Sequence, residues 1–417
     1  MSSTSHAHSR PHSAFTNAAF RAHFTTYVLA MMADNIEHVI SYWVAFQKFH
    51  SPALAGFAVI SHWTPFLLFS VAVGALGDRL DPRRLVQIGM ALFMICSLGW
   101  GYFFLTGTLT MTAAVVLLII HGMAGVLWQT SNQLLLHDLV PREQLQSAVR
   151  LNATARYLGV LVGPAVGGAI MLALGPVRGI FLNTAFYLPL LLWMWKAPCG
   201  PKFRQGSAPV RAVRGLSDIL QTVRDIANNP VIVTVTLLAG LASFFIGNSY
   251  QAQMPGFAQD LGHANPGVAY SSLLAADACG AMVAGILLET LPLLRPNPRT
   301  ALLLAAAWSI AIFGFALTRN YPAALCLLFI AGMVELSFSS MAQTLVQLNA
   351  PAATRGRVIG LFNMSALGLR AFSGITGLVA SLVGIHVSLA AAAIALLATI
   401  AILLLTHRPA EPVPAQG

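Results

Sequence analysis

The stretch "GALGDRLDPRRL", residues 74–85, decides the fold, because it places acidic and basic residues between two long apolar runs. Those runs cover residues 53–77 and 85–106. An apolar helix of ~20 residues crosses the hydrocarbon core of a bilayer. The stretch therefore predicts a short aqueous loop between two transmembrane helices.

The same pattern continues along the chain. Only 9% of the 417 residues are charged, whereas a soluble domain carries about 25%. Backbone groups in lipid must be hydrogen-bonded internally, so long apolar runs form helices. Twelve runs are long enough: 23–46, 53–77, 85–106, 109–137, 145–174, 177–196, 229–256, 266–291, 299–318, 322–348, 357–384 and 386–406. We expect an all-α integral membrane protein with twelve transmembrane helices.

The basic residues are unevenly distributed. With the N-terminus inside the cell, all but five of the 23 Lys and Arg residues lie in or beside cytoplasmic segments. Lys48, Arg178 and Arg319 fall outside, and Arg156 and Arg370 lie within helices. This asymmetry follows the positive-inside rule. It predicts that both termini are cytoplasmic, and it explains the net charge of +10 without nucleic-acid binding.

The longest connection, residues 197–228, divides six predicted helices from six. It separates a first bundle, residues 23–196, from a second bundle, residues 229–406. The tails at residues 1–22 and 407–417 are predicted to be cytoplasmic and disordered. The segment "VRAVRGLSDILQTVRDIANN", 210–229, has apolar residues at helical spacing and basic residues between them. It predicts an amphipathic helix on the inner leaflet, with a soluble linker helix as the alternative.

The two halves repeat each other. Gln133 corresponds to Gln343 at a shift of 210, as do Pro141 to Pro351 and Gly167 to Gly377. A fainter copy, at a shift of 211, pairs Gly74 with Gly285 and Asp78 with Glu289. Such repeats are typical of secondary transporters, whose substrate sites lie between the halves.

The loop at 74–85 resembles a signature of the major facilitator superfamily, G-x-x-x-D-[RK]-x-G-[RK]-[RK]. The matching residues are Gly74, Asp78, Arg79, Arg83 and Arg84, while Asp81 replaces the usual glycine and Pro82 the first following base. The resemblance covers essentially the whole chain and points to the bacterial exporter branch. It implies two pseudo-symmetric six-helix bundles in a bacterial inner membrane. It also implies that Asp78 contacts the N-terminus of the eleventh helix and holds a cytoplasmic gate closed.

A second motif, "LGVLVGPAVGGAI" at 158–170, resembles the fifth-helix motif of antiporter branches of this family. It contains Gly159, Gly163, Pro164, Gly167 and Gly168, although Ala155 stands where the motif has an upstream glycine. Small residues permit close backbone approach, and proline bends a helix. The motif favours export, with ordinary tight helix packing as the alternative.

The first apolar run contains three ionisable residues, Asp34, Glu37 and His38, on about one helical face. Each would cost about 2.5–3.5 kcal/mol near the bilayer centre, so they must point inward. They could carry the driving proton, or bind a cationic substrate. Alternatively, Asp34 could be structural, paired with His38, Arg156 or Arg370. His62 and His121, each alone in an apolar run, are predicted to be structural.

Other polar residues recur every third helix, in the first, fourth, seventh and tenth. This period predicts that these four helices line a central cavity. The predicted cavity residues are Gln129, Asn132, Gln133, Asn248, Tyr250, Gln251, Glu335 and Gln343. Arg156, Asp277 and Arg370 are secondary charge partners.

These features predict a monomeric secondary transporter that exports a small organic molecule, such as a drug-like compound, siderophore or metabolite, in exchange for protons. No Walker motif, HExxH motif or nucleophile elbow is present, so we expect neither an enzyme nor a metal or other cofactor. An importer, a lysophospholipid transporter and a non-transporting membrane sensor are the alternatives.

Overall fold

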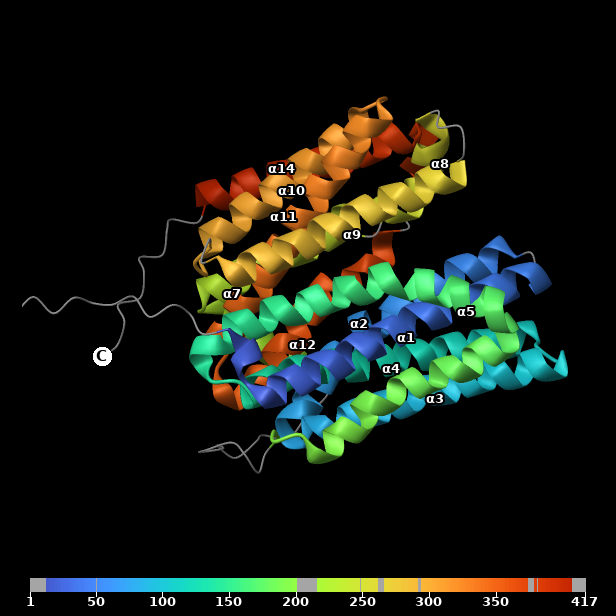
Figure 1. Cartoon of the computed structure of the whole chain (residues 1–417). Coiled ribbons are helices and arrows are strands. Elements are labelled where there is room, and N and C mark those ends of the chain that lie inside the picture. The colour runs from blue at the N-terminus through green and yellow to red at the C-terminus, as the bar shows by residue number, and fades with distance from the viewer. Residues whose placement is uncertain are drawn as a thin grey trace, which may run out of the picture.

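The computed structural model describes residues 13–49, 51–200, 216–247, 249–261, 266–291, 294–373, 379–380 and 382–406. The first half contains α1 (Ala18–Phe49), α2 (Pro52–Arg79), α3 (Pro82–Thr106), α4 (Met111–Leu139) and α5 (Leu145–Lys196). The second half contains α7 (Pro230–Phe245), α8 (Ser249–Asp260), α9 (Pro266–Thr290), α10 (Pro298–Leu317), α11 (Tyr321–Asn349), α12 (Arg355–Ala366), the 3₁₀ helix η5 (Gly368–Ser373) and α14 (Ile385–Thr406). Figure 1 shows the first half, blue to green, mostly below the second half, yellow to red, with the orange α12 lower in the view than the other helices of its half and in contact with α2.

Four of these helices, α2, α3, α7 and α10, start at a short polar residue followed by proline. Ser51 and Pro52 begin α2, and Asp81 and Pro82 begin α3. Each cap accepts a hydrogen bond from an N–H of the first turn, and proline at the first position needs no such partner. Asp81, which departs from the family signature, therefore has a structural use as the N-cap of α3.

Eight helices among the described residues are long and apolar enough to cross a membrane. One of them, α5, makes two crossings, because Gly175 with φ 76 and the following Pro176 form a kink between them. The remaining crossings are made by α1, by α7 with α8, and by α12 with η5. These three are more polar or shorter than the others, which is why hydropathy alone does not mark them.

Two predicted runs are interrupted in the structure. The run predicted at 229–256 breaks between α7 and α8, where Gly247 has φ 40. The run predicted at 357–384 breaks where α12 ends and η5 begins. At that break a side chain on Gly368 would lie 2.5 Å from the Leu67 Cα of α2, so the irregular segment is packed against the first half.

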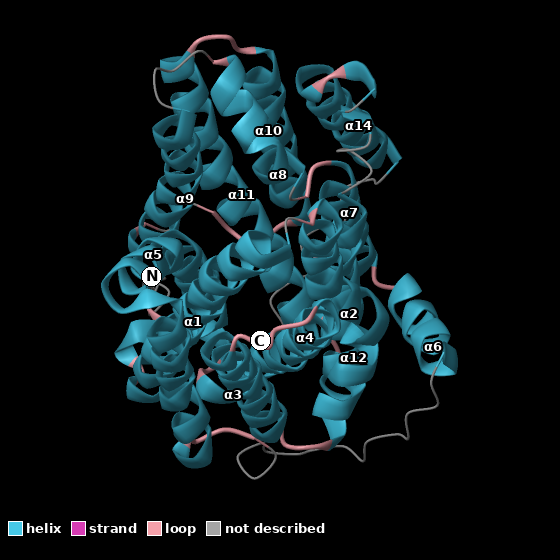
Figure 2. Cartoon of the chain, turned by 90° about the vertical axis from the view of Figure 1, so that its right-hand side faces the viewer, coloured by secondary structure: helices cyan, strands magenta, loops and turns pink. Residues whose placement is uncertain are grey.

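The connection between the halves contains helix α6 (Leu216–Ala227), at the edge of the molecule beside α7 and α12 (Figure 2). Ile226 is buried there, whereas Leu220 and Val223 are exposed. An exposed apolar face is what an interfacial helix requires. Its position on the leaflet and the domain boundaries remain predictions.

The glycines of the fifth-helix motif bring α5 close to α1. A Cβ on Gly159 would lie 2.5 Å from Met31 Cβ, and one on Gly163 would lie 2.5 Å from Asn35 Cβ. Gly167 faces Ile36, whereas Gly168 has open space around it and Pro164 is exposed. The residues of α1 that meet α5 are therefore those beside Asp34 and Glu37, which turns both carboxylates toward the interior of the bundle.

This packing predicts different effects for two glycine substitutions. Gly163→Val should lower stability by about 1–3 kcal/mol, because overpacking forces α1 and α5 apart. Gly168→Val is the matched control, since its side chain would meet nothing within 4 Å. Thermal unfolding of the detergent-solubilised protein measures both, and equal midpoints would contradict the close contact.

Candidate functional site

The two halves are joined at one end by a contact that we call the α12 clasp, formed by Gly74, Asp78, Gly356 and Arg357. The Asp78 carboxylate accepts hydrogen bonds from the backbone N–H groups of Gly356, at 2.7 Å, and Arg357, at 3.2 Å. These N–H groups have no partner within α12, and the helix dipole adds positive charge there. Gly74 permits the approach, because its Cβ would lie 1.9 Å from the Gly356 carbonyl oxygen.

A second contact, the α5 clasp, joins the C-terminal end of α9 to the start of α5. The Glu289 carboxylate accepts from Ser147 Oγ at 2.5 Å and from Arg150 Nη2 at 3.1 Å. Gly285 lies one turn earlier, where a Cβ would come within 2.1 Å of Thr154 Oγ1. Glu289 and Gly285 correspond to Asp78 and Gly74 in the internal repeat, so the two clasps are related by the same pseudo-symmetry.

The other signature residues lie outside the clasps. Arg83 pairs with Asp81 at 2.6 Å and donates to the Ala197 carbonyl at 2.9 Å. This ties the start of α3 to the end of α5. Arg79 and Arg84 are exposed.

The ionisable residues of α1 form a buried cluster with His121 of α4. His121 Nε2 lies 3.0 Å from Asp34 Oδ1, and His121 Nδ1 lies 2.8 Å from Glu37 Oε1. Ser97 of α3 donates a hydrogen bond to the other Glu37 oxygen. One imidazole thus bridges two carboxylates that are both at least 95% buried.

Two more histidines complete this cluster. The His38 ring lies 4.7 Å from that of His121 and 5.1 Å from that of His62 in α2, between ring centroids. One ring nitrogen from each of the three histidines lies within 4.8 Å of the other two. This spacing is longer than a hydrogen bond, and it is one that could hold a metal ion.

The partner of Asp34 was not evident from the sequence. His121 occupies the place for which His38, Arg156 and Arg370 were candidates, and His62 joins it. Each is a lone histidine in an apolar run, and only the tertiary packing of α1, α2 and α4 brings them together. The single available signal was that two histidines and three polar α1 residues all occur at mid-helix depth.

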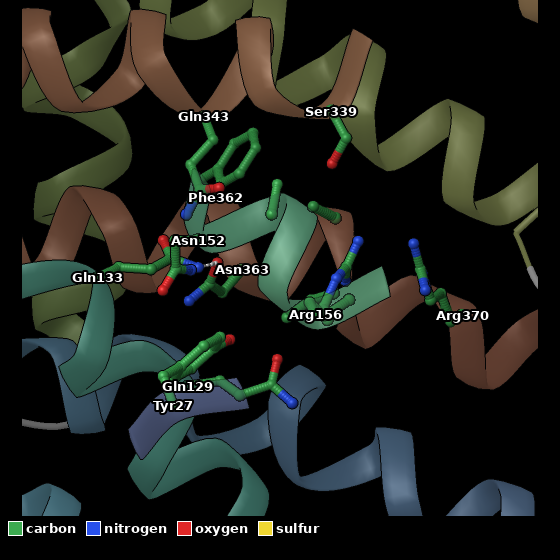
Figure 3. A pocket seen from close by; sticks show the side chains of 13 residues that line it. Tyr27, Gln129, Gln133, Asn152, Arg156, Ser339, Gln343, Phe362, Asn363 and Arg370 are labelled. Atoms are coloured by element: carbon green, nitrogen blue, oxygen red, sulfur yellow. Dashed lines mark hydrogen bonds between the residues drawn. The ribbon is translucent and has the colours of Figure 1, made fainter. Parts of the chain in front are cut away.

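A cavity lies between the halves, lined by residues of α1, α4, α5, α11, α12 and η5 (Figure 3). Gln129, Gln133 and Gln343, predicted as cavity residues, line it. So do Arg156 and Arg370, predicted as charge partners. Across the cavity Gln133 Nε2 donates to Asn363 Oδ1 at 3.0 Å, which links α4 to α12. The remaining lining residues are Tyr27, Asn152, Ala153, Ser339, Phe362, Asn363, Ala366 and Leu367.

Other predicted cavity residues lie elsewhere. Asn132 is buried and donates to Asn152 at 2.9 Å. The Tyr250 hydroxyl lies 3.0 Å from Glu335 and 3.1 Å from Asp277, in the interior of the second half. Asn248 and the side chain of Gln251 are outside the described residues. The seventh-helix residues that are described therefore do not line this cavity, because the break at Gly247 sends α8 into the core of the second half.

With the fold and these contacts established, comparison with known proteins identifies the class. The sequence model of the Major Facilitator Superfamily matches residues 18–374, so the chain belongs to this family. It is a multi-pass membrane protein and a secondary transporter rather than an enzyme. The predicted family and fold are confirmed.

Individual relatives are more distant. The chain is 23% identical over 353 residues to the enterobactin exporter EntS of Citrobacter koseri, which covers 83% of this chain and 81% of that protein. The structure of a variant of the Escherichia coli fucose:proton symporter FucP matches with a TM-score of 0.70 at 14% identity, over 92% of this chain and 97% of that one. FucP in the outward conformation gives 0.73 at 13% identity, over 93% and 98%. At these identities the structural likeness shows the fold alone.

The α12 clasp makes a testable prediction about access to the cavity. Asp78→Asn removes the charge that holds the start of α12, and charge-assisted hydrogen bonds contribute about 1.5–3 kcal/mol each. We expect the halves to separate more often at this end, which raises the labelling rate of a cysteine at position 339 several-fold. The measurement uses a membrane-impermeant maleimide on everted vesicles, with the four native cysteines replaced.

Arg84→Gln is the control for the same assay, because Arg84 belongs to the same loop but is exposed. It should leave the labelling rate unchanged. A rate in Asp78→Asn equal to that of the parent protein would show that the clasp does not limit access.

Proposed function

We propose that this protein exports a small organic molecule from the bacterial cytoplasm in exchange for protons, by alternating access. In this proposal it works as a monomer in the inner membrane with both termini in the cytoplasm. The observation that carries the proposal is the buried Asp34–His121–Glu37 arrangement, which lies inside the transport fold and has no evident structural need for two carboxylates on one imidazole.

Proton coupling requires a group that gains and loses a proton as its surroundings change. Asp34 and Glu37 share one imidazole, so moving His121 would leave a buried carboxylate without this partner and favour its protonation. Ionisable groups on the surrounding helices influence how easily either carboxylate takes up a proton. They are His38 and Tyr42 of α1, His62 of α2, Cys96 of α3 and Tyr187 of α5. The charge of Arg370 acts on His62.

Alternating access requires that both clasps open together. Each clasp consists of one carboxylate at one helix start, so each can form and break without unfolding a helix. Placed at the cytoplasmic side by the positive-inside rule, they would be closed when the cavity faces outward. In this proposal, the conformation with both clasps formed is assigned to that state.

Export rather than import is supported by two observations. The relatives that cover most of the chain include exporters, and the α5 glycines have the spacing of antiporter branches. A cavity lined mainly by amide, hydroxyl and guanidinium groups also favours a water-soluble molecule over a lysophospholipid.

Proton flux in everted vesicles tests the proposal. An exported compound added outside acidified vesicles should release lumenal protons in the parent protein, and Asp34→Asn and Glu37→Gln should each reduce the release at least tenfold. Asp260→Asn is the matched control, because Asp260 is an exposed carboxylate that pairs with His386 at 3.2 Å in the second half. A panel of drug-like compounds, siderophores and metabolites supplies the candidates.

Proton release that persists in both α1 variants would overturn the assignment of coupling to this cluster. It would move coupling to Glu335 or Asp277. Transport of a compound without any proton movement in the parent protein would overturn proton exchange itself.

A further inference from the structure

The central cavity carries positive charge at its surface. Among the described residues that line it, Arg156 and Arg370 are the charged ones, and no carboxylate lines it. Both guanidinium groups lie toward the same side of the cavity, away from Gln133 and Asn363 (Figure 3). The acids of α1, considered above as a site for a cationic substrate, are instead buried against His121.

Arg156 has no counter-ion among the residues that the structure describes. Within the described part of the chain its guanidinium forms neither an ion pair nor a hydrogen bond, and its one recorded contact is with the Tyr157 ring, 5.2 Å from the ring centroid. A half-buried cation inside a membrane protein is costly when it is unpaired. An anion that binds in the cavity would pair with this guanidinium group and offset that cost.

Arg370 is held in place by residues of both halves. Its guanidinium lies over the Trp63 ring of α2, 5.2 Å from the centroid, and 4.0 Å from the Glu335 carboxylate of α11. Glu335 also accepts the Tyr250 hydroxyl, which fixes its orientation. Asp277 lies 3.1 Å from the same hydroxyl, so two carboxylates are held near Arg370, whereas none of the described carboxylates pairs with Arg156.

We infer that the transported molecule is an organic anion whose carboxylate, or another oxyanion group, binds between Arg156 and Arg370. This inference rests on the proposed function and specifies its substrate class. Guanidinium binds oxyanions through two parallel N–H donors, and Arg156 has all its donors available. Gln129 and Gln343 then supply neutral hydrogen-bonding groups for the rest of the molecule.

Binding to the purified full-length protein tests this inference without requiring transport. The probes are matched sets on one scaffold: benzoate, benzamide and benzylamine, with the corresponding acids, amides and amines of larger aromatic and aliphatic scaffolds. We expect thermal stabilisation by acids and not by their amides or amines. The comparison uses the unmodified protein, so it does not depend on a variant that folds.

Variants then locate the site. Arg156→Gln should weaken binding of a stabilising acid about tenfold or more, since a charge-assisted hydrogen bond is lost. Arg156→Lys should keep the preference for acids with lower affinity, because an ammonium keeps the charge without the paired donors. Arg84→Gln, which removes the same charge from an exposed loop, should bind as the parent protein does.

Three results would overturn the inference: stabilisation by amides or amines equal to that by acids, stabilisation by none of the acids at their solubility limit, or acid binding unaffected by Arg156→Gln. Failure of proton exchange is a separate outcome. Acid binding that requires Arg156, without proton release in vesicles, would leave the substrate class standing and remove the coupling mechanism.

Discussion

Two contacts hold the halves of the structure together, and each places a carboxylate of one helix at the start of another. Asp78 meets the first N–H groups of α12, and Glu289 meets the first turn of α5. One turn earlier, Gly74 approaches the backbone of Gly356, and Gly285 approaches the Thr154 side chain. The Asp78 contact combines hydrogen bonds with a helix-end charge, and the Glu289 contact uses hydrogen bonds from the Ser147 and Arg150 side chains; each contributes a few kcal/mol. That is enough to hold two bundles together at one end, and little enough for ligand binding to reverse.

The buried charges of α1 depend on the same kind of close approach, this time within one half. The glycines of α5 have no side chains, and Met31, Asn35 and Ile36 of α1 occupy the space that a Cβ would need. The two helices therefore pack closely. Helical geometry then directs the adjacent positions 34 and 37 toward α3 and α4, where Ser97 and His121 meet them. A glycine motif that contains no charged residue thus determines where two carboxylates lie in the membrane. Its cost in helix propensity is offset because lipid-embedded helices gain stability from close packing.

The sequence allowed prediction of whatever is encoded locally or by repetition. The apolar runs and the loop signature both depend on neighbours in the chain. Comparison of one half of the sequence with the other showed that Asp78 and Glu289 occupy equivalent positions in the repeat. By contrast, His121 and Glu37 are 84 residues apart, and nothing in a single sequence indicates that a lone histidine on α4 faces an acid on α1. The break at Gly247 was equally hidden, because the glycine lies in an apolar run and only its positive φ shows that the helix ends there. Arg156 could be recognised as unusual in the sequence, but its lack of a partner is a property of the packed structure.

The arrangement also suggests how the substrate site and the clasp communicate. Gly356, at the start of α12, is bound to Asp78, and Arg370 lies on η5, which follows the same helix at its other end. Between them, Asn363 accepts a hydrogen bond from Gln133 of α4 at the cavity wall. The clasp and the cavity wall therefore share α12, and Arg370 lies beyond the break that separates α12 from η5. Arg370 lies over the Trp63 ring, and that ring lies 4.6 Å from the His62 ring of the histidine cluster, between centroids. In the proposed function, an anion bound beside Arg370 would therefore change the electrostatic field in which Asp34 and Glu37 gain or lose a proton.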